Sequence, residues 1–217
     1  FYHDAKSKGI KAGIYQGKTK SVIPIESCLL QDEETNEIIQ TVCRLAKSFK
    51  LKPHDRKAHS GTLRHALIRR AFGTGEIMVV IVTTNAKFNS ERSFVNALAA
   101  AHPDIKTIVH NINPDGEDIT LGEKSRVIYG DGYIEDLLCG LKFRISPASF
   151  YQINHKQTEI LYSTAIDYAK IKENDKVLDA YCGIGTIGIM AAKRKADVTG
   201  VEINQSAVWD AKANAEI

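Results

Sequence analysis

The sequence predicts an α/β protein, with an α+β region over residues 1–148 and the first part of a doubly wound parallel sheet over residues 149–217. Two observations support this fold class. In the last third of the chain, short apolar strands alternate with helices, which is the pattern of a parallel sheet covered by helices. In the first half, two expected strands, the second of them β-branched, flank a short glycine turn, which indicates an antiparallel hairpin. Pro147 marks the change in character, so we place the domain boundary near residue 148.

The elements of the first region follow from periodicity and turn residues. Apolar residues recur at helical spacing from Glu34 to Phe49, which predicts an amphipathic helix. The two hairpin strands, a second helix with Ser90 as its N-cap and one further strand come next. We expect these four elements at residues 62–72, 77–84, 91–101 and 105–112. A loop-rich bridge is then expected from Gly116 to Gly140, before a last strand over residues 141–146.

The second region has the simpler pattern of alternating helices and strands. We expect helices at residues 155–170, 185–195 and 204–216, and strands at residues 176–180 and 197–202. Two strands in about 70 residues are too few for a complete sheet of this class. The chain also begins with Phe1 instead of Met. We therefore expect an internal fragment of a longer protein, incomplete at its N-terminal side and truncated in its second domain.

Composition and charge exclude several classes of protein. The chain is 43% apolar and 25% charged, and it lacks both a signal peptide and the run of about 20 apolar residues that a membrane helix needs. A net charge of +3 is too small to indicate nucleic-acid binding by itself. The four cysteines, Cys28, Cys43, Cys139 and Cys182, are scattered without a CxxC pair. These features predict a reduced, cytoplasmic protein with no membrane partner.

Residues 177–202 carry the main chemical signal. An apolar strand ends on Asp179, a turn containing Gly183 and Gly185 opens a helix, and a second short strand ends on Glu202. Glycines let the backbone approach a nucleotide-type ligand closely. A carboxylate at the tip of the next strand accepts hydrogen bonds from a ribose diol. The segment therefore predicts a site for a cofactor that contains a ribose.

The glycines also match the dinucleotide pattern G-x-G-x-x-G over residues 183–188. In that fingerprint the strand runs almost directly into the first glycine, whereas here Ala-Tyr-Cys separates Asp179 from Gly183. A carboxylate at this place opposes a pyrophosphate and suits a cationic amino-acid end, which S-adenosylmethionine has. The sequence favours this cofactor. A nicotinamide-dependent oxidoreductase, or a glycine turn that only packs a helix on a strand, remains an alternative.

Two segments together resemble the RNA uracil-5-methyltransferase family. They are Pro-Ala-Ser-Phe-Tyr-Gln-Ile-Asn at residues 147–154 and Asp-Ala-Tyr-Cys-Gly-Ile-Gly-Thr at residues 179–186. Similar upstream segments lie at residues 63–70, 75–80 and 128–130, so the resemblance covers most of residues 10–217. It implies an RNA-facing α+β domain, a Rossmann-like class I methyltransferase domain, and methyl transfer from S-adenosylmethionine to C5 of uridine. The branch that modifies 23S rRNA is the most similar, with a tRNA uracil-5-methyltransferase as an alternative.

The resemblance assigns cofactor contacts to five residues. Gln152 would hydrogen-bond the amino-acid end of the cofactor, and Thr186 would lie near its methionine part. Tyr181 would pack beside the cofactor, Gly183 would allow close backbone approach, and Glu202 would bind the ribose hydroxyls. An amide in an interdomain linker is the alternative for Gln152, and a plain core aromatic is the alternative for Tyr181.

RNA contacts are expected from three residues. Phe150 would stack on a flipped base, with a place in the hydrophobic core as the alternative. Arg64 and Arg69 share one predicted strand with Arg70. Side chains alternate along a strand, so at most two of these arginines would follow one phosphate track. A solvated basic face is the alternative for them, and no obligate protein partner is expected.

No catalytic residue can be assigned within this chain. The family's chemistry needs a cysteine that adds to C6 of uracil, which makes C5 nucleophilic, and a base that later removes the C5 proton. In the family that cysteine follows an Asp-Pro-Pro-Arg segment, which does not occur here. We therefore expect the nucleophile to lie outside this chain and the chain alone to be inactive. A non-catalytic RNA-binding protein with a vestigial cofactor fold is the alternative.

The resemblance also raises a [4Fe–4S] cluster as a second cofactor. Many members of the family bind it through three clustered cysteines and a fourth further along. Cys28, within residues 25–30, resembles the fourth position, and the other three would precede Phe1. One thiolate does not hold a cluster. Cys28 is therefore either an orphaned cluster ligand or a buried structural thiol.

Overall fold

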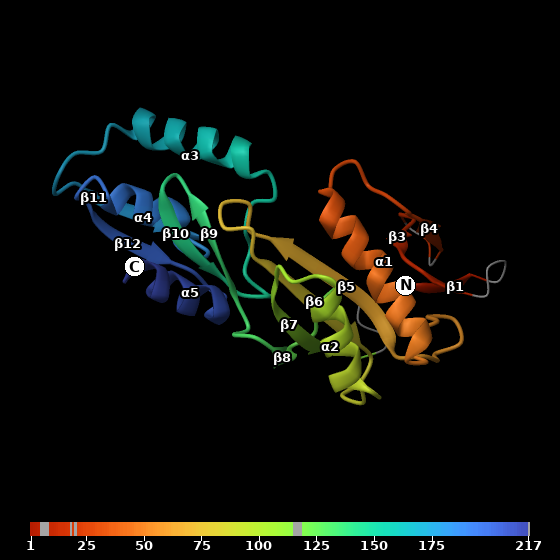
Figure 1. The fold of residues 1–217 in the computed structure, drawn as a ribbon. Coiled ribbons are helices and arrows are strands. Elements are labelled where there is room, and N and C mark those ends of the chain that lie inside the picture. The colour runs from red at the N-terminus through yellow and green to blue at the C-terminus, as the bar shows by residue number, and fades with distance from the viewer. Residues whose placement is uncertain (5–8, 18, 20, 115–118, 217) are drawn as a thin grey trace. The chain divides into compact units, whose positions relative to one another are not determined.

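The structure is a computed structural model that describes residues 1–4, 9–17, 19, 21–114 and 119–216 (Figure 1). The chain forms two compact units. The first unit consists of Phe1–Arg70 and Ile77–Gly132, and the second consists of Ala71–Glu76 and Tyr133–Ile217. This division lies before the boundary expected near residue 148, because the hairpin at residues 134–145 contacts the last helix of the second unit.

A four-stranded mixed sheet forms the centre of the first unit. Its strands are β5 (Leu63–Arg70), β6 (Ile77–Thr83), β7 (Ile105–Ile112) and β8 (Lys124–Tyr129), in that spatial order. β5 and β6 form the expected antiparallel hairpin, and β6 runs parallel to β7. β8 pairs antiparallel with β7 at the edge. The hairpin prediction is confirmed.

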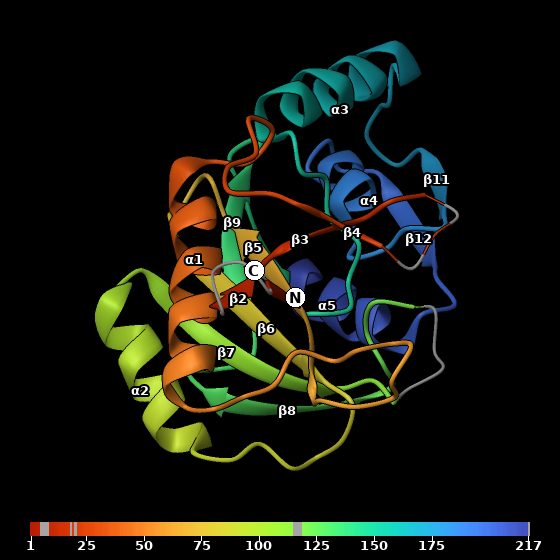
Figure 2. The same ribbon diagram turned by 90° about the vertical axis from the view of Figure 1, so that its right-hand side faces the viewer.

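Two helices cover one face of this sheet (Figure 2). Helix α1 (Glu33–Ser48) begins at Asp32, whose side chain accepts a hydrogen bond from the Thr35 N–H. Helix α2 (Glu91–Ala101) follows Ser90 as expected, but Ser90 has a left-handed backbone and its side chain makes no capping bond. Four three-residue strands that the sequence analysis missed precede α1. They are β1 (Tyr2–Asp4), β2 (Gly9–Lys11), β3 (Gly13–Tyr15) and β4 (Val22–Pro24).

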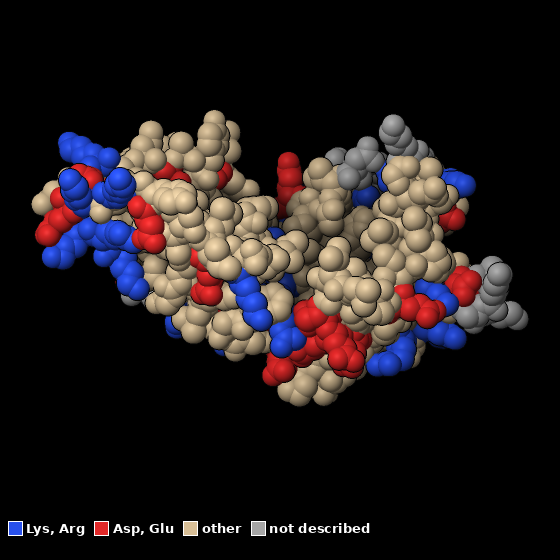
Figure 3. Space-filling view, turned by 90° about the horizontal axis from the view of Figure 1, so that it is seen from above, with Lys and Arg blue, Asp and Glu red and all other residues tan. Residues whose placement is uncertain are grey.

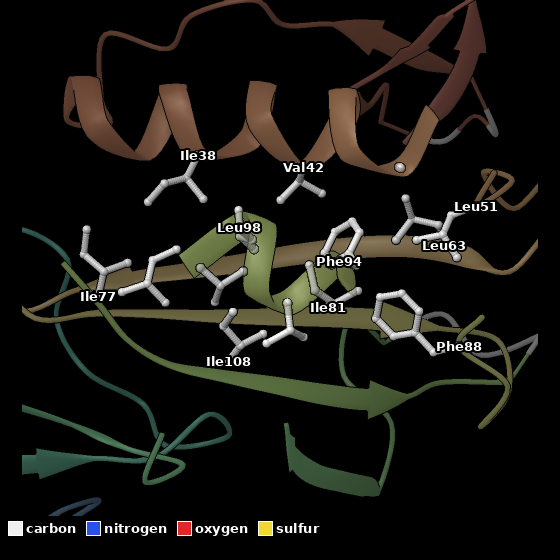
Figure 4. Packing of buried hydrophobic residues seen from close by; sticks show 14 residues of the cluster. Ile38, Val42, Leu51, Leu63, Ile77, Ile81, Phe88, Phe94, Leu98 and Ile108 are labelled. Carbon is white, nitrogen blue, oxygen red and sulfur yellow. The ribbon is translucent and has the colours of Figure 1, made fainter. Parts of the chain in front are cut away.

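The core of the first unit lies between α1, α2 and the sheet. Figure 4 shows Ile38 and Val42 of α1 pointing toward the strands, with Phe94 of α2 beside them. Phe94 is fully buried and packs edge-on against Phe49 and Phe88. Burial of large apolar side chains on this scale is the main stabilising term for such a layer.

The second unit contains the predicted α/β pattern. A hairpin of β9 (Ile134–Leu138) and β10 (Leu141–Ile145) leads into α3 (His155–Ala169). β11 (Lys176–Ala180), α4 (Thr186–Ala192), β12 (Asp197–Val201) and α5 (Gln205–Ala215) complete the unit. β11 and β12 are parallel, with Asp179 opposite Gly200. A parallel pair joined by a helix is the repeating step of a doubly wound sheet.

The loop-rich bridge expected from Gly116 to Gly140 is wrong, because β8 and β9 lie within it. Its first residues, 116–118, are outside the described part of the chain. β8 is an edge strand in which every residue except the half-buried Ile128 is exposed, so it lacks the apolar alternation that marks a strand. In β9, the buried positions alternate, but the middle one is Asp136. Because Asp136 is acidic, β9 lacks the alternation of apolar residues that indicates a strand.

Surface charge matches the near-neutral composition. On the face of the described residues seen in Figure 3, Lys and Arg side chains are interspersed with Asp and Glu. None of the helices in the described ranges has the length and apolar character needed to cross a membrane.

Candidate cofactor-binding site

The glycine turn after β11 is tightly folded. Tyr181, Gly183 and Gly185 have positive φ angles of 65°, 55° and 85°. This conformation is unstrained for glycine, but it costs of order 1–3 kcal/mol at a residue such as Tyr181. Apart from Gly183 and its two chain neighbours, no described residue has an atom within 4 Å of the place where a Cβ on Gly183 would stand. The turn thus presents open backbone to any ligand that lies beside Gly183.

Glu202, directly after β12, binds the backbone of the glycine turn. Its Oε2 accepts the Gly183 N–H at 3.0 Å, and its Oε1 accepts the Asn204 N–H at 2.7 Å. These backbone hydrogen bonds, first that from Asn204, hold the pKa of the Glu202 carboxyl below its usual range. Each carboxylate oxygen can accept two hydrogen bonds, so both oxygens keep capacity for a ligand hydroxyl. Glu202 therefore lies where a carboxylate could bind a ribose diol and holds the turn at the same time.

Asp179 has a structural partner within the same loop. Its Oδ2 accepts the N–H of Gly188 at 2.8 Å. Burial raises the pKa of the Asp179 carboxyl. A Cβ at position 188 would stand 2.9 Å from this oxygen, so the third glycine of the pattern allows helix α4 to approach the strand. The last glycine of G-x-G-x-x-G serves packing in this chain.

Cys182 is a packing residue in the turn. Its N–H donates to the Val201 carbonyl at 3.0 Å, which continues the contact between the two strands. Burial raises the pKa of its thiol, and a Cβ on Gly200 would stand 3.0 Å from its sulfur. A thiol with a raised pKa is a weak nucleophile at neutral pH.

The segment before α3 carries Phe150 and Gln152. Phe150 is 72% exposed, so it is free of the hydrophobic core. Gln152 is half-buried. Between them, the Tyr151 hydroxyl donates to the buried Asp136 carboxylate at 3.1 Å, and burial raises the pKa of Tyr151. Tyr151 thus fixes the segment between the exposed Phe150 and the half-buried Gln152.

The remaining predicted cofactor residues lie at the opening of α4. Tyr181 is 91% exposed, so it is no core aromatic. Thr186 is the first residue of the helix and is buried. The structure therefore places Tyr181, Gly183, Thr186 and Glu202 on one loop system within the second unit.

Two residues that sequence reasoning missed fasten this loop system. Asp210 and Asn214 lie one helical turn apart on α5 and are 2% and 3% exposed. Asp210 accepts hydrogen bonds from Ser146 and Ser149. Asn214 donates to the Ile184 carbonyl at 3.0 Å. A polar pair at i, i+4 on the buried side of an alanine-rich helix is the signal that could have found them.

The predicted RNA contacts Arg64 and Arg69 belong to β5 in the first unit. Arg64 is 5% exposed, and its Nη1 donates to the backbone and side-chain oxygens of Asn113, each at 3.0 Å, and to the Pro114 carbonyl. Arg69 is half-buried. Arg70 forms ion pairs with Asp32 at 2.8 Å and with Glu34. Buried hydrogen bonds therefore engage the Arg64 guanidinium inside the unit.

Cys28 lies in the loop before α1, beside a cavity of about 710 Å³ that Asn36, Arg44 and His102 also line. Its backbone N–H donates to the Asn36 side chain at 3.1 Å. The residue is half-buried, with its thiol free of any disulfide. Within the described residues, no group of three or more His, Cys, Asp or Glu could hold a metal ion. This set of residues does not fit a [4Fe–4S] cluster.

Comparison with known proteins agrees with this geometry. Residues 155–217 match the family model of the methyltransferase small domain. A protein of Bacillus cereus named as an uncharacterized RNA methyltransferase is 41% identical over 209 residues, which cover 96% of this chain and 45% of that protein. One from Halalkalibacterium halodurans is 39% identical, with 96% and 46% coverage. This chain is similar to RNA methyltransferases. It spans about half the length of the curated relatives that it matches.

A solved structure extends the similarity to the fold. The tRNA (uracil-54, C5)-methyltransferase of Pyrococcus abyssi, in complex with S-adenosyl-L-homocysteine, superposes with a TM-score of 0.79 at 27% identity. The match covers 93% of this chain and 48% of that one. The predicted α/β fold class, with a Rossmann-like methyltransferase fold, is confirmed.

Proposed function

We propose that this chain forms the RNA-facing and cofactor-binding parts of an S-adenosylmethionine-dependent RNA methyltransferase acting on C5 of uridine. The observation that carries the proposal is the pairing of Glu202 with the open turn at Gly183. When bound, the cofactor supplies an activated methyl group on a sulfonium. Similarity to named RNA methyltransferases over nearly the whole chain supports RNA as the substrate class.

The position of each residue suggests which part of the cofactor or RNA it contacts in this proposal. Glu202 accepts hydrogen bonds from the ribose hydroxyls with the lone pairs that Gly183 and Asn204 leave open. Gln152 binds the amino-acid end, with Thr186 near the methionine part and Tyr181 packing beside the cofactor. Phe150, outside the core, offers its ring to an RNA base.

The nucleophile of the proposed reaction is assigned to no cysteine of this chain. Burial raises the pKa of the Cys43 thiol to about 11 and also raises that of Cys182. Thiols of this kind carry little thiolate at neutral pH. The proposal therefore assigns the covalent adduct to neither Cys43 nor Cys182.

Ligand protection tests the cofactor assignment. A ligand at about 100 times its Kd stabilises the folded state by about 2.7 kcal/mol, which raises Tm by roughly 5–10 °C in a chain of this size. S-adenosylhomocysteine should produce such a shift, and NAD should not. Glu202→Gln should reduce the shift, and Glu173→Gln, an exposed glutamate that contacts Lys195, should leave it unchanged. Protection by NAD alone would support the oxidoreductase alternative.

The RNA remains to be chosen between two candidates. Resemblance to the ribosomal branch supports 23S rRNA, and the solved relative that acts on tRNA supports a transfer RNA. Binding of the chain to transcripts of both, compared at several salt concentrations, separates them. A preference for tRNA would replace the 23S rRNA assignment, and no preference for either would favour a general RNA-binding module.

A further inference from the structure

Helix α5 has a buried face that is polar. Its most buried residues are Ala207, Asp210 and Asn214, so two of the three carry polar side chains. Burying a carboxylate or an amide is costly unless hydrogen bonds replace those lost from water. The partners of these side chains therefore indicate what the helix face is built to hold.

Asp210 holds the segment that leads to Gln152. Its Oδ2 accepts the Ser146 N–H at 2.9 Å and the Ser149 hydroxyl at 2.7 Å. Its Oδ1 accepts the Ser146 hydroxyl at 2.7 Å, and the Arg144 Nε lies 3.4 Å away. Ser149 is completely buried. One carboxylate thus fixes both ends of the turn from Ser146 to Ser149.

Asn214 holds the strand before that turn and the glycine loop together. Its Oδ1 accepts the Arg144 N–H at 2.7 Å, and its Nδ2 donates to the Arg144 carbonyl at 3.2 Å. The same Nδ2 donates to the Ile184 carbonyl at 3.0 Å, between Gly183 and Gly185. The amide therefore contacts two segments that are about 40 residues apart in the sequence, and such directional bonds fix their separation.

We propose that Asp210 and Asn214 are positioning residues, which set the distance between the Gln152 segment and the Gly183 turn for cofactor binding. The inference rests on the proposed function, because it takes Gln152 and Gly183 as cofactor contacts. Only Phe150 and Tyr151 lie between Ser149 and Gln152, so a shift at Ser149 reaches Gln152 directly. Tyr151, held by Asp136, is a second fixed point of this segment, directly before Gln152.

A double-mutant cycle on the affinity for S-adenosylhomocysteine tests the proposal. Asp210→Asn and Gln152→Ala should each weaken binding about tenfold, the loss that corresponds to about 1.4 kcal/mol. If Asp210 acts through Gln152, the double variant should bind no more than about threefold more weakly than Gln152→Ala alone. Ser149→Ala removes one bond to Asp210 and should behave in the same way if Asp210→Asn does not fold. Affinities are measured well below each variant's Tm.

Matched controls come from exposed residues of α3 in the same unit. Asp167→Asn and Ser163→Ala should leave the affinity unchanged. A full hundredfold loss in the double variant would overturn the proposal, because additive losses mean that Asp210 does not act through Gln152. Unchanged affinity in both Asp210→Asn and Ser149→Ala would overturn it as well. Absence of any binding by the unsubstituted protein is a different result, which refutes the proposed function itself.

Discussion

Arg64→Met separates a structural role from the RNA contact that the sequence predicts for Arg64. Methionine retains much of the length of arginine but donates no hydrogen bond. In the structure the Arg64 guanidinium is buried and donates to both oxygens of Asn113 and to the Pro114 carbonyl. Asn113 is completely buried and its N–H donates to the Thr83 carbonyl at 2.8 Å. Arg64 therefore fastens the chain where it leaves β7.

The expected loss of stability follows from the hydrogen-bond acceptors that lose their donor in Arg64→Met. A buried acceptor without a partner costs about 1–3 kcal/mol, and both oxygens of the buried Asn113 lose their donor, whereas the exposed Pro114 can turn to water. We expect Arg64→Met to lower the free energy of unfolding by about 3–5 kcal/mol, a large share of the roughly 5–15 kcal/mol of a typical domain. Tm should fall by roughly 6–20 °C.

Urea unfolding measures the loss, and RNA binding over a salt series provides the second readout. The midpoint should fall with little change in slope, and the salt dependence of RNA binding should remain as in the unsubstituted protein. Arg92→Met, at an exposed position of α2, is the control and should change neither quantity. An unchanged urea midpoint together with a lower salt slope would refute the structural reasoning and support Arg64 as a phosphate contact.

Four further predictions concern single residues. Burial lowers the pKa of His65 from 6.5 to about 4. Between these two pH values the unfolded chain binds a proton at His65 that the folded chain does not bind. The free energy of unfolding should therefore fall by up to about 3 kcal/mol as pH drops from 6.5 to 4. Urea midpoints at pH 7 and pH 5 should differ less in His65→Phe, and an equal difference would contradict the assignment. Arg69→Ala should weaken RNA binding and lower its salt slope by about 1, and an unchanged slope would leave Arg69 a solvated face. Phe94→Ala should cost about 3–5 kcal/mol in urea unfolding, and a loss below about 1 would contradict the packing. Gly188→Ala should destabilise by about 1–3 kcal/mol because its Cβ meets Asp179 at 2.9 Å, and unchanged stability would mean that the helix can shift.

Elements with strong periodicity could be predicted from the sequence. Helix α1, the β5–β6 hairpin and the alternating elements of residues 155–216 lie close to where the sequence places them. β8 and β9 could not be found by the same method. Most side chains of β8 are exposed, and Asp136 replaces an apolar residue at a buried position of β9. Its carboxylate accepts the N–H of the adjacent Leu137 and that of Gly73, which is a tertiary partner that a local pattern does not contain.

Some residues of the candidate site could be predicted from the sequence, and others could not. The glycine turn and Glu202 were visible because a ligand needs those residue types at a fixed spacing along one βαβ unit. The structure adds that Glu202 binds the Gly183 N–H itself, and that Asp179 binds Gly188. Asp210 and Asn214 were not predicted, because their partners lie 30 to 70 residues away. Their hydrogen bonds are properties of the folded chain alone.

The two units rely on different interactions: apolar packing stabilises the first, and buried hydrogen bonds fix segments of the second. In the first unit, apolar side chains such as Ile38 and Phe94 fill the space between helices and sheet. Packing of this kind stabilises strongly but tolerates substitutions that keep volume. In the second unit, Asp210 and Asn214 hold the segments that would face the cofactor through hydrogen bonds to backbone groups, and Asp136 does so through the Tyr151 hydroxyl. Such bonds depend steeply on distance and angle, so each fixes a position more narrowly than apolar contact does. A site that must hold two segments at one spacing therefore gains more from buried polar side chains than from a larger apolar core.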